Sequence, residues 1–335
     1  MDSGQNILTD KTPSALFLVL TINPGGEGAV RDALEGLEGL VTTVSSRAPE
    51  ATLTAIISIG SDAWDRLFSG PRPAELHPFV ELTGDTHTAP ATPGDLLLHI
   101  KSSRPDLAFE VGRLWTATLG DAVTTVDETH GFRYFDLRDL TGFVDGTENP
   151  AGDDAVQVIT VDPDDDPEFA GGSYVAVQKY VTDFPSWNAL PVPDQENTFG
   201  RSKLENVEMD DDTKPSNAHT ALTNLPDVDG QSQEIFRDNM PFGDIAGDGE
   251  KGTYFIAYSK TPAITELMLR NMFIGDPVGN HDRLLDFTTA VTGTQFFAPS
   301  TDFLADLPEA PTAPSEEPTE DASPSDGSLG IGALK

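Results

Sequence analysis

Six histidines and no cysteine limit the metal and redox chemistry that this chain can perform. Without cysteine there is no disulfide scaffold, no iron–sulfur cluster, no thiolate-bound zinc or haem and no Cys nucleophile. No two histidines have the i, i+4 spacing of a helical metal pair, and no His-x-Glu or Glu-x-x-His pattern occurs, so zinc hydrolase and di-iron sites are not expected. A lone imidazole such as His219 can be the axial ligand of an iron porphyrin or an ordinary structural histidine.

The string from Gly142 to Pro150, Gly-Phe-Val-Asp-Gly-Thr-Glu-Asn-Pro, is the most distinctive in the chain. It places Asp145 among glycines that permit tight bends, although an ordinary Asp-Gly turn would have the same residues. A second cluster, residues 236–243, carries Arg237. An arginine that stays charged, combined with a carboxylate in a closed site, is suited to stabilising the charge that develops on a peroxide O–O bond.

The chain is strongly acidic: its 335 residues contain 20 Lys and Arg against 56 Asp and Glu, a formal net charge of −36. Phosphate backbones and anionic membranes bind clustered Lys and Arg, so neither nucleic acid nor a membrane is an expected partner. The 37% of hydrophobic residues, with 18 Phe, suffice for a sizeable core. The N-terminus lacks the basic segment and twin arginine of export signals, which predicts a soluble, cytoplasmic protein.

Apolar periodicity in the first half of the chain predicts the order β-α-β-β-α-β. A buried strand over 15–22 precedes a helix with Val30, Leu34 and Leu37 on one face. The other predicted elements of this half are strands at 53–59, 95–101 and 122–127 and a helix that begins at Arg104-Pro105.

The second half repeats part of this order. Its predicted elements are strands at 174–180 and 253–258, short helices at 185–190 and 194–200, and a longer helix from Thr261-Pro262 to just before Gly275. A strand, a polar residue, Xaa-Pro and an amphipathic helix therefore occur at 95–116 and again at 253–274. We interpret this as an internal duplication, which predicts an α+β fold of two ferredoxin-like halves, residues 1–140 and 141–305.

The composition changes again at Asp306, where prolines alternate with acidic residues and almost no apolar residue remains. Such a segment cannot bury enough surface to order itself, so 306–325 is predicted to be an extended linker. The last ten residues, 326–335, carry Leu329, Ile331 and Leu334 spaced by glycines. They are either a short peptide that docks into a groove on a partner or a frayed tail with incidental leucines.

Six parts of the chain together carry a family resemblance, and they are 142–150, 171–179, 200–203, His219, 237–243 and 282–287. With these parts the chain resembles a dye-decolorizing peroxidase, in particular the bacterial branch called type B, over nearly all of residues 10–305. The resemblance implies two ferredoxin-like halves of the dimeric α+β barrel type. It also implies one b-type haem per chain, held by the second half.

The resemblance implies a role for several residues around this haem. His219 matches the proximal axial ligand of the iron, and Arg201 matches a residue that meets a haem propionate. A carboxylate that accepts the other imidazole N–H is expected in 282–287, where Asp282 is favoured over Asp286. Such an acceptor makes the imidazole more basic and favours high-valent iron.

On the distal side, the resemblance implies Asp145, Arg237 and Asn239. Hydrogen peroxide would bind the ferric haem, and a base would move a proton from its near oxygen to its far one, so that O–O cleavage leaves an oxoferryl intermediate. Asp145 has the chemistry of that base, Arg237 can hold the peroxide anion and the departing hydroxide, and Asn239 can position water. Organic donors such as dyes or phenolics would then give up electrons one at a time. The relative weight of Asp145 and Arg237 stays open.

The resemblance also extends to partners. Residues 326–335 resemble the peptide that loads such peroxidases into encapsulin shells, with Leu329, Ile331 and Leu334 as anchors, which implies a location inside an encapsulin nanocompartment in the cytoplasm. The family implies a hexamer of three dimers. Two other functions remain open: a haem or porphyrin carrier of the deferrochelatase type, which needs no distal Arg and Asp, and an acidic scaffold of the shell, which would bind no haem.

Overall fold

The structure, a computed structural model, describes residues 4–228, 230, 233–246 and 249–312. In the first half, the predicted order β-α-β-β-α-β is confirmed, with a short added helix and hairpin. Its elements in chain order are β1 (Ser14–Ile22), α1 (Glu27–Ser45), β2 (Leu53–Gly60), α2 (Ser61–Leu67), β3 (Leu82–Thr83), β4 (Thr88–Ala89), β5 (Leu96–Ser102), α3 (Pro105–Leu119), η1 (Gly120–Ala122) and β6 (Val123–Phe132).

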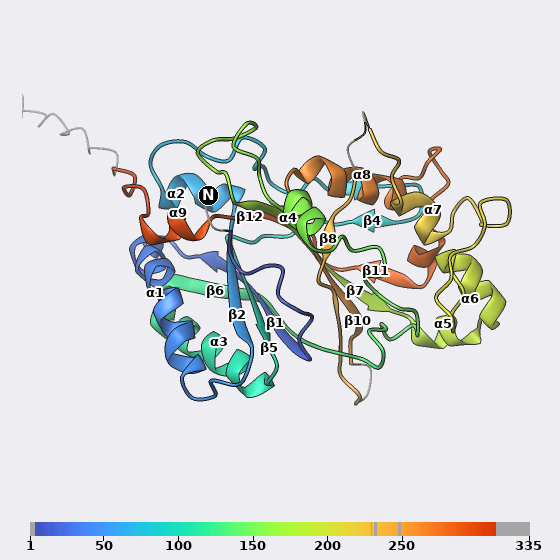
Figure 1. The fold of residues 1–335 in the computed structure, drawn as a ribbon, viewed down its shortest axis with the longest axis horizontal. Coiled ribbons are helices and arrows are strands. Elements are labelled where there is room, and N and C mark those ends of the chain that lie inside the picture. The colour runs from blue at the N-terminus through green and yellow to red at the C-terminus, as the bar shows by residue number, and fades with distance from the viewer. Residues whose placement is uncertain (1–3, 229, 231–232, 247–248, 313–335) are drawn as a thin grey trace, which may run out of the picture.

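β1 is apolar from Ala15 to Leu20 because both of its faces are covered. Leu16, Leu18 and Leu20 belong to the core beneath the helices α1 and α3, while Phe17 and Val19 belong to the core on the other face of the sheet. Since successive side chains of a strand point to opposite faces, a strand between two cores reads as a continuous apolar run. Figure 1 shows α1 and α3 together on the outer side of this half.

The second half contains the predicted strands and helices and several short elements that the sequence did not predict. Its elements in chain order are α4 (Asp153–Ile159), β7 (Ser173–Thr182), α5 (Phe184–Ala189), α6 (Val192–Phe199), α7 (His219–Thr223), β8 (Phe236–Arg237), β9 (Met240–Gly243), β10 (Lys251–Ser259), α8 (Pro262–Phe273), η2 (Arg283–Asp286), β11 (Thr288–Ala290), β12 (Thr294–Ala298) and α9 (Thr301–Ala305).

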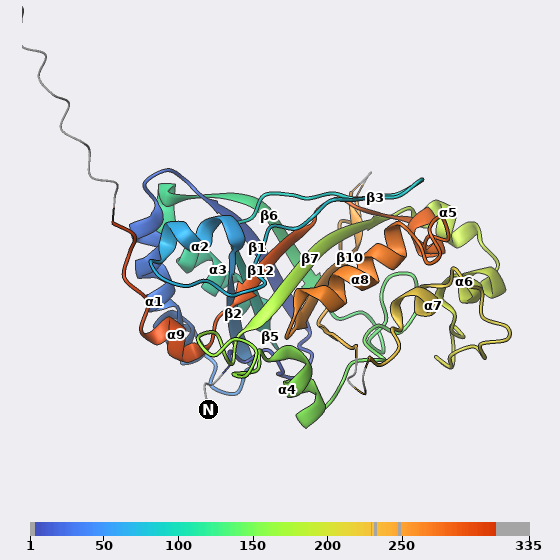
Figure 2. The same cartoon turned by 90° about the horizontal axis from the view of Figure 1, so that it is seen from above.

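Helix α8 begins and ends as its sequence predicts. Thr261 caps it, with its hydroxyl accepting from Ala263 N at 3.3 Å, and Pro262 occupies the first turn. Gly275 follows the last turn with φ +99°, a conformation that few other residues adopt. Figure 2 shows α8 beside β7 and β10, which are paired strands of the sheet in the second half.

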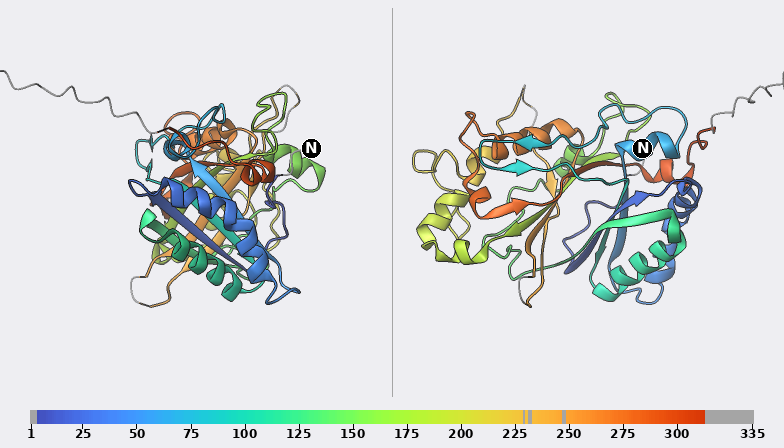
Figure 3. Two further views of the ribbon diagram at one scale, coloured as in Figure 1. Left: turned by 90° about the vertical axis from the view of Figure 1, so that its left-hand side faces the viewer. Right: turned by 180° about the vertical axis from the view of Figure 1, so that it is seen from behind.

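One continuous sheet joins the two halves, in the strand order β6-β1-β5-β2-β12-β7-β10-β8. The junction is the antiparallel pair β2–β12, in which Phe297 lies opposite Ile59. The far ends of the sheet also approach each other, because a Cβ on Gly131 of β6 would lie 2.5 Å from the Cβ of Met240 in β9. The sheet is therefore a nearly closed barrel, and the predicted α+β fold of two paired halves is confirmed (Figure 3).

After α9 the chain stays against the first half for several residues. Leu307 packs on the core beneath α1, and Ser69 donates from its backbone N and its Oγ to the carbonyl oxygen of Glu309 at 2.8 and 2.9 Å. From residue 313 onward, the predicted linker and the predicted docking peptide 326–335, with Leu329, Ile331 and Leu334, lie outside the described residues. Among the residues described, no helix is long and apolar enough to cross a membrane.

Candidate functional site

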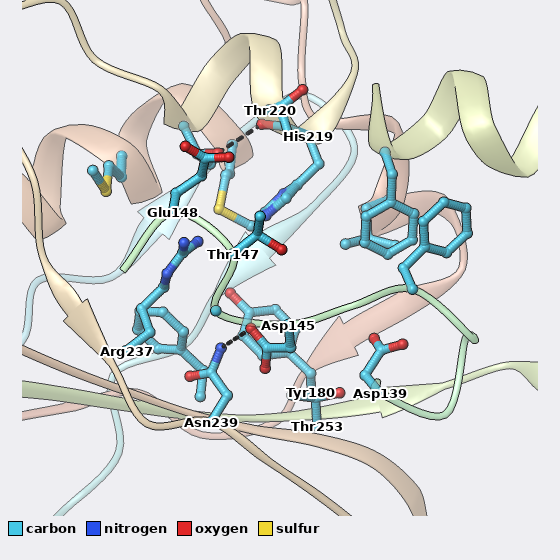
Figure 4. A pocket seen from close by; sticks show the side chains of 18 of the residues that line it. Asp139, Asp145, Thr147, Glu148, Tyr180, His219, Thr220, Arg237, Asn239 and Thr253 are labelled. Atoms are coloured by element: carbon cyan, nitrogen blue, oxygen red, sulfur yellow. Dashed lines mark hydrogen bonds between the residues drawn. The ribbon is translucent and has the colours of Figure 1, made fainter. Parts of the chain in front are cut away.

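A deep pocket opens in the second half of the chain, with about 1200 Å³ of empty space including its mouth. β7 and β10 line it with Tyr180 and Phe255, and α8 adds Met268 and Met272. The loop 139–148 closes another side. A large, mainly apolar cavity with a few converging polar groups is the usual form of a cofactor or substrate site. Five residues singled out from the sequence line this one pocket: His219, Asp145, Arg237, Asn239 and Arg201. Figure 4 shows the first four.

His219 is the first residue of α7, and a buried carboxylate holds its ring. Its Nδ1 lies 2.7 Å from Asp282 Oδ2, and Asp282 is completely buried. The other oxygen of Asp282 accepts from Leu284 N at 2.8 Å and so caps η2. Because Nδ1 is engaged in this way, Nε2 is the nitrogen available for a ligand in the pocket. Asp286, the other candidate carboxylate, lies instead against His87 and His281.

Close packing of two helices brings His219 to the pocket wall. Gly200 directly follows α6 with φ +81°, and a Cβ there would lie 2.3 Å from Thr220 Oγ1. Only glycine fits both the backbone conformation and the approach of α7. Phe199, the last residue of α6, meets the His219 ring edge-on at 6.0 Å between centroids.

The Gly142–Pro150 string is a loop that is fastened to β8 by one side chain. Gly142 and Gly146 have φ of +93° and +81°, which allows the bends that the sequence indicated. Asn149 donates from Nδ2 to Arg237 O at 2.6 Å and accepts from Arg237 N at 3.0 Å. This amide therefore fixes the backbone of the arginine that enters the pocket. The sequence analysis assigned no role to Asn149.

Asn239 orients Asp145 in the same region. Its Oδ1 accepts from Ile256 N at 3.0 Å, which turns its Nδ2 toward Asp145 Oδ1 at 3.2 Å. The second oxygen of Asp145 and the Nε of Arg237 are buried and have no hydrogen-bond partner among the described residues. A buried polar group without a partner costs about 1–3 kcal/mol, so two of them in one pocket indicate a place for a polar ligand. Figure 4 shows these groups across the pocket from His219.

Arg201 lies at the rim with its charge already shared. Its Nη1 contacts Glu148 Oε1 at 2.6 Å and Glu208 Oε2 at 3.3 Å, and its Nε donates to Asn206 Oδ1 at 3.1 Å. An arginine paired in this way is held in a fixed orientation. A carboxylate ligand that reached Arg201 would share it with these two side chains.

Asp139 is a pocket residue that the sequence analysis missed. Burial of its carboxyl group, with a smaller contribution from the nearby charge of Asp145, raises its pKa, while the N–H and hydroxyl of Thr141 donate to it and oppose the rise, so that the pKa is about 6. Nothing in the string Leu137-Arg-Asp-Leu distinguishes this aspartate from a surface one, because its environment comes from distant parts of the chain.

Comparison with known protein families agrees with this fold. A model described as "Dyp-type peroxidase, N-terminal" matches residues 4–133, and one described as "Dyp-type peroxidase, C-terminal" matches residues 136–303. The chain belongs to the Dyp-type, or dye-decolorizing, peroxidase family.

Relatives that align with the whole chain show more closely which proteins it resembles within this family. The dye-decolorizing peroxidase of Rhodococcus erythropolis is 60% identical over 99% of this chain and 96% of its own length, and that of Mycobacterium tuberculosis is 57% identical over 99% and 97%. Among solved structures, the encapsulated DyP-type peroxidase from Mycobacterium smegmatis is 57% identical, with a TM-score of 0.90 over 93% of this chain and 100% of that one. A DypB variant from Rhodococcus jostii in complex with haem is 52% identical, with a TM-score of 0.88 over 91% and 98%. The protein is a peroxidase, and the predicted family and enzyme class are confirmed.

Proposed function

We propose that the pocket binds one haem b, with Nε2 of His219 as the ligand of the iron. The observation that carries this proposal is the pair His219 and Asp282, in which a fully buried carboxylate 2.7 Å from Nδ1 leaves Nε2 for a metal. The mainly apolar cavity suits a porphyrin, and the DypB variant of Rhodococcus jostii that was solved with haem has the same fold. Arg201, which lines the pocket, is the cation that would meet a haem propionate. Glu148 and Glu208 already contact Arg201, so the propionate would share the guanidinium group with them.

The unpaired polar atoms across the pocket from His219 suit hydrogen peroxide as the substrate. When bound, haem supplies the iron at which the O–O bond breaks and holds the two oxidising equivalents. Asp145 Oδ2, which is free because Asn239 holds Oδ1, accepts the proton from the near oxygen of the peroxide and returns it to the far one. The Arg237 guanidinium stabilises the negative charge that develops on the departing hydroxide.

Organic donors such as dyes or phenolics would supply electrons one at a time to a haem held in this pocket. Such donors need not enter the pocket, since electrons reach a buried centre through the protein. A haem carrier or deferrochelatase-like function requires neither the free Asp145 oxygen nor the Arg237 side chain in the pocket. Their presence favours the peroxidase reaction.

We also propose that residues 326–335 load the protein into an encapsulin shell, so that it works inside a nanocompartment in the cytoplasm as a hexamer of three dimers. The Mycobacterium smegmatis relative is described as encapsulated. Within the described residues, the chain leading toward this peptide is bound at Glu309 by Ser69 of the first half, whereas the pocket belongs to the second half. This attachment is compatible with docking that leaves the pocket uncovered.

An absorption spectrum of the haem-supplemented full chain tests the haem proposal. We expect a Soret band that changes on addition of one equivalent of peroxide. His219→Ala should lose or grossly change this band, while His130→Ala, which removes an exposed histidine paired with Glu128 at 2.8 Å, should leave it unchanged. A wild-type chain without a Soret band, or a His219→Ala spectrum identical to wild type, would contradict the assignment.

A further inference from the structure

Three side chains outside the pocket bring metal-ligand atoms together. His87 Nε2 and His281 Nε2 lie 3.0 and 3.2 Å from the same carboxylate oxygen, Oδ1 of Asp286. The ligand atoms of all three residues lie within 4.8 Å of one another, and the two imidazole rings meet at 4.7 Å between centroids. Neither histidine is near the other in sequence, so spacing rules could not have found this group.

Well-defined backbone presents each of the three side chains. His87 belongs to the turn of the β3–β4 hairpin, where Gly84 N donates to His87 O at 2.9 Å. Gly84 lies so close to the end of α8 that a Cβ there would lie 2.0 Å from Phe273 O. His281 follows a loop that Asn280 ties to Ser216 and Asp276 with hydrogen bonds of 2.9 Å each. Asp286 is the last residue of η2, whose first turn is capped by Asp282.

Two of the three separations between ligand atoms are close to those of a metal centre. Two ligand atoms that each lie about 2.1 Å from a tetrahedral zinc ion are about 3.4 Å apart. The two Nε2–Oδ1 separations of 3.0 and 3.2 Å are close to this value, so an ion could replace the two shared protons with small side-chain shifts. Two imidazoles and a carboxylate suit a divalent transition metal such as zinc better than magnesium or calcium, which prefer oxygen ligands.

We propose that His87, His281 and Asp286 form a binding site for a divalent transition-metal ion, with Zn²⁺ as the best-suited probe. The side chain of Asp286 is 45% exposed, while those of the two histidines are 19% and 24% exposed, so the ion can enter from solvent and keep a water as its remaining ligand. The net charge of −36 concentrates cations near the surface of the protein.

Such an ion would join two distant parts of the chain. His87 belongs to a hairpin of the first half and Asp286 lies 199 positions later in sequence. Asp286 is also in the short segment η2 that starts from Asp282, the residue that holds His219. The bound ion would therefore fasten the support of His219 to the first half. A ligand that binds only the folded chain raises its thermal stability, so the unfolding midpoint should rise with zinc concentration.

Zinc titration of the haem-loaded, tag-free full chain tests the site. Isothermal titration calorimetry in 150 mM salt should show one zinc per chain, and the affinity should fall at least tenfold in His87→Ala and in His281→Ala. His77→Ala is the matched control, because it removes a similar histidine–carboxylate contact, 3.1 Å to Glu266, without touching the site. At the zinc absorption edge, the bound ion should show nitrogen and oxygen neighbours at about 2.0–2.1 Å.

Bound haem keeps His219 from binding zinc, and the Soret band shows separately whether haem is bound. Failure of the haem proposal can therefore be told apart from failure of the zinc-site proposal. The unfolding midpoints without zinc show whether each variant still folds. No saturable zinc binding by the wild type would overturn the proposal. So would equal affinity of the wild type and both site variants, or loss of binding in His77→Ala, because either result would place the zinc elsewhere.

Discussion

The side chain of Asn149 holds the backbone of Arg237 by two hydrogen bonds, of 2.6 Å to its carbonyl oxygen and 3.0 Å from its N–H. Asn149→Ala removes both bonds but leaves the guanidinium group itself in the chain. A hydrogen bond contributes about 0.5–1.5 kcal/mol net, so the two together are worth about 1–3 kcal/mol. If this free energy is lost from the transition state, the reaction with peroxide slows by about 5-fold to about 150-fold.

Stopped-flow absorbance measures this effect. The haem-loaded variant is mixed with peroxide, and the second-order rate constant for the change in the Soret band is compared with that of wild type. The Soret intensity before mixing shows that haem is still bound. We expect the peroxide step to slow and the later reduction by an organic donor to be unaffected, because the side chain of Asn149 acts on the pocket through the position of Arg237.

Gln5→Ala is the matched control for this variant. Gln5 also holds backbone with its amide, donating to Ile57 O at 2.8 Å and to Pro299 O at 2.9 Å and accepting from Ile57 N at 2.9 Å, but none of these residues lines the pocket. Gln5→Ala should lower stability by at least as much without slowing the peroxide step. A wild-type rate for Asn149→Ala, or an equal slowing in Gln5→Ala, would show that Asn149 does not support the peroxide step through Arg237.

Three further predictions follow from the pocket and the tail. The pKa of Asp139 is raised, mainly by burial, to about 6, above its unfolded value, so its contribution to stability is present below about pH 4 and lost as pH rises through 6. Denaturant unfolding should therefore show the free energy of unfolding of Asp139→Asn gaining about 1–3 kcal/mol on that of wild type between pH 4 and 7. A difference that stays constant with pH would contradict the raised pKa. Asp282→Asn removes the anionic acceptor of His219 Nδ1, so the reduction potential of bound haem should rise in spectroelectrochemistry, whereas an unchanged potential would exclude this role. Deletion of 326–335 should abolish co-purification with the encapsulin shell and leave peroxidase activity intact, and retained packaging would disprove the docking role.

Much of the fold could be predicted because its main elements carry local signals. β1 carries the apolar run from Ala15 to Leu20, and α8 has both a Thr-Pro start and a glycine stop, so each was found close to its observed bounds. β8, β9 and β12 are short, and nothing local marks them as strands. The pairing of β12 with β2, which makes one sheet of the two halves, depends on long-range register.

Several residues of the site could also be predicted, because they belong to short sequence strings. A family resemblance pointed to His219, Asp145 and Arg237, which the structure brings together around one pocket. The two hydrogen bonds from the side chain of Asn149 to the backbone of Arg237 could not be predicted, because the two residues are 88 positions apart. Asp282 and Asp286 lie in one short string, and only the folded chain separates them, with one against His219 and the other against His87 and His281.

A haem held by His219, with Asp145 and Arg237 on the opposite face, would be seen in a crystal structure of the haem-loaded full chain. We predict that the iron binds Nε2 of His219, that Asp282 keeps its contact with Nδ1, and that the free oxygen of Asp145 and the Arg237 guanidinium face the open side of the iron. Iron bound by another residue, or Asp145 and Arg237 on the same face as His219, would contradict the account.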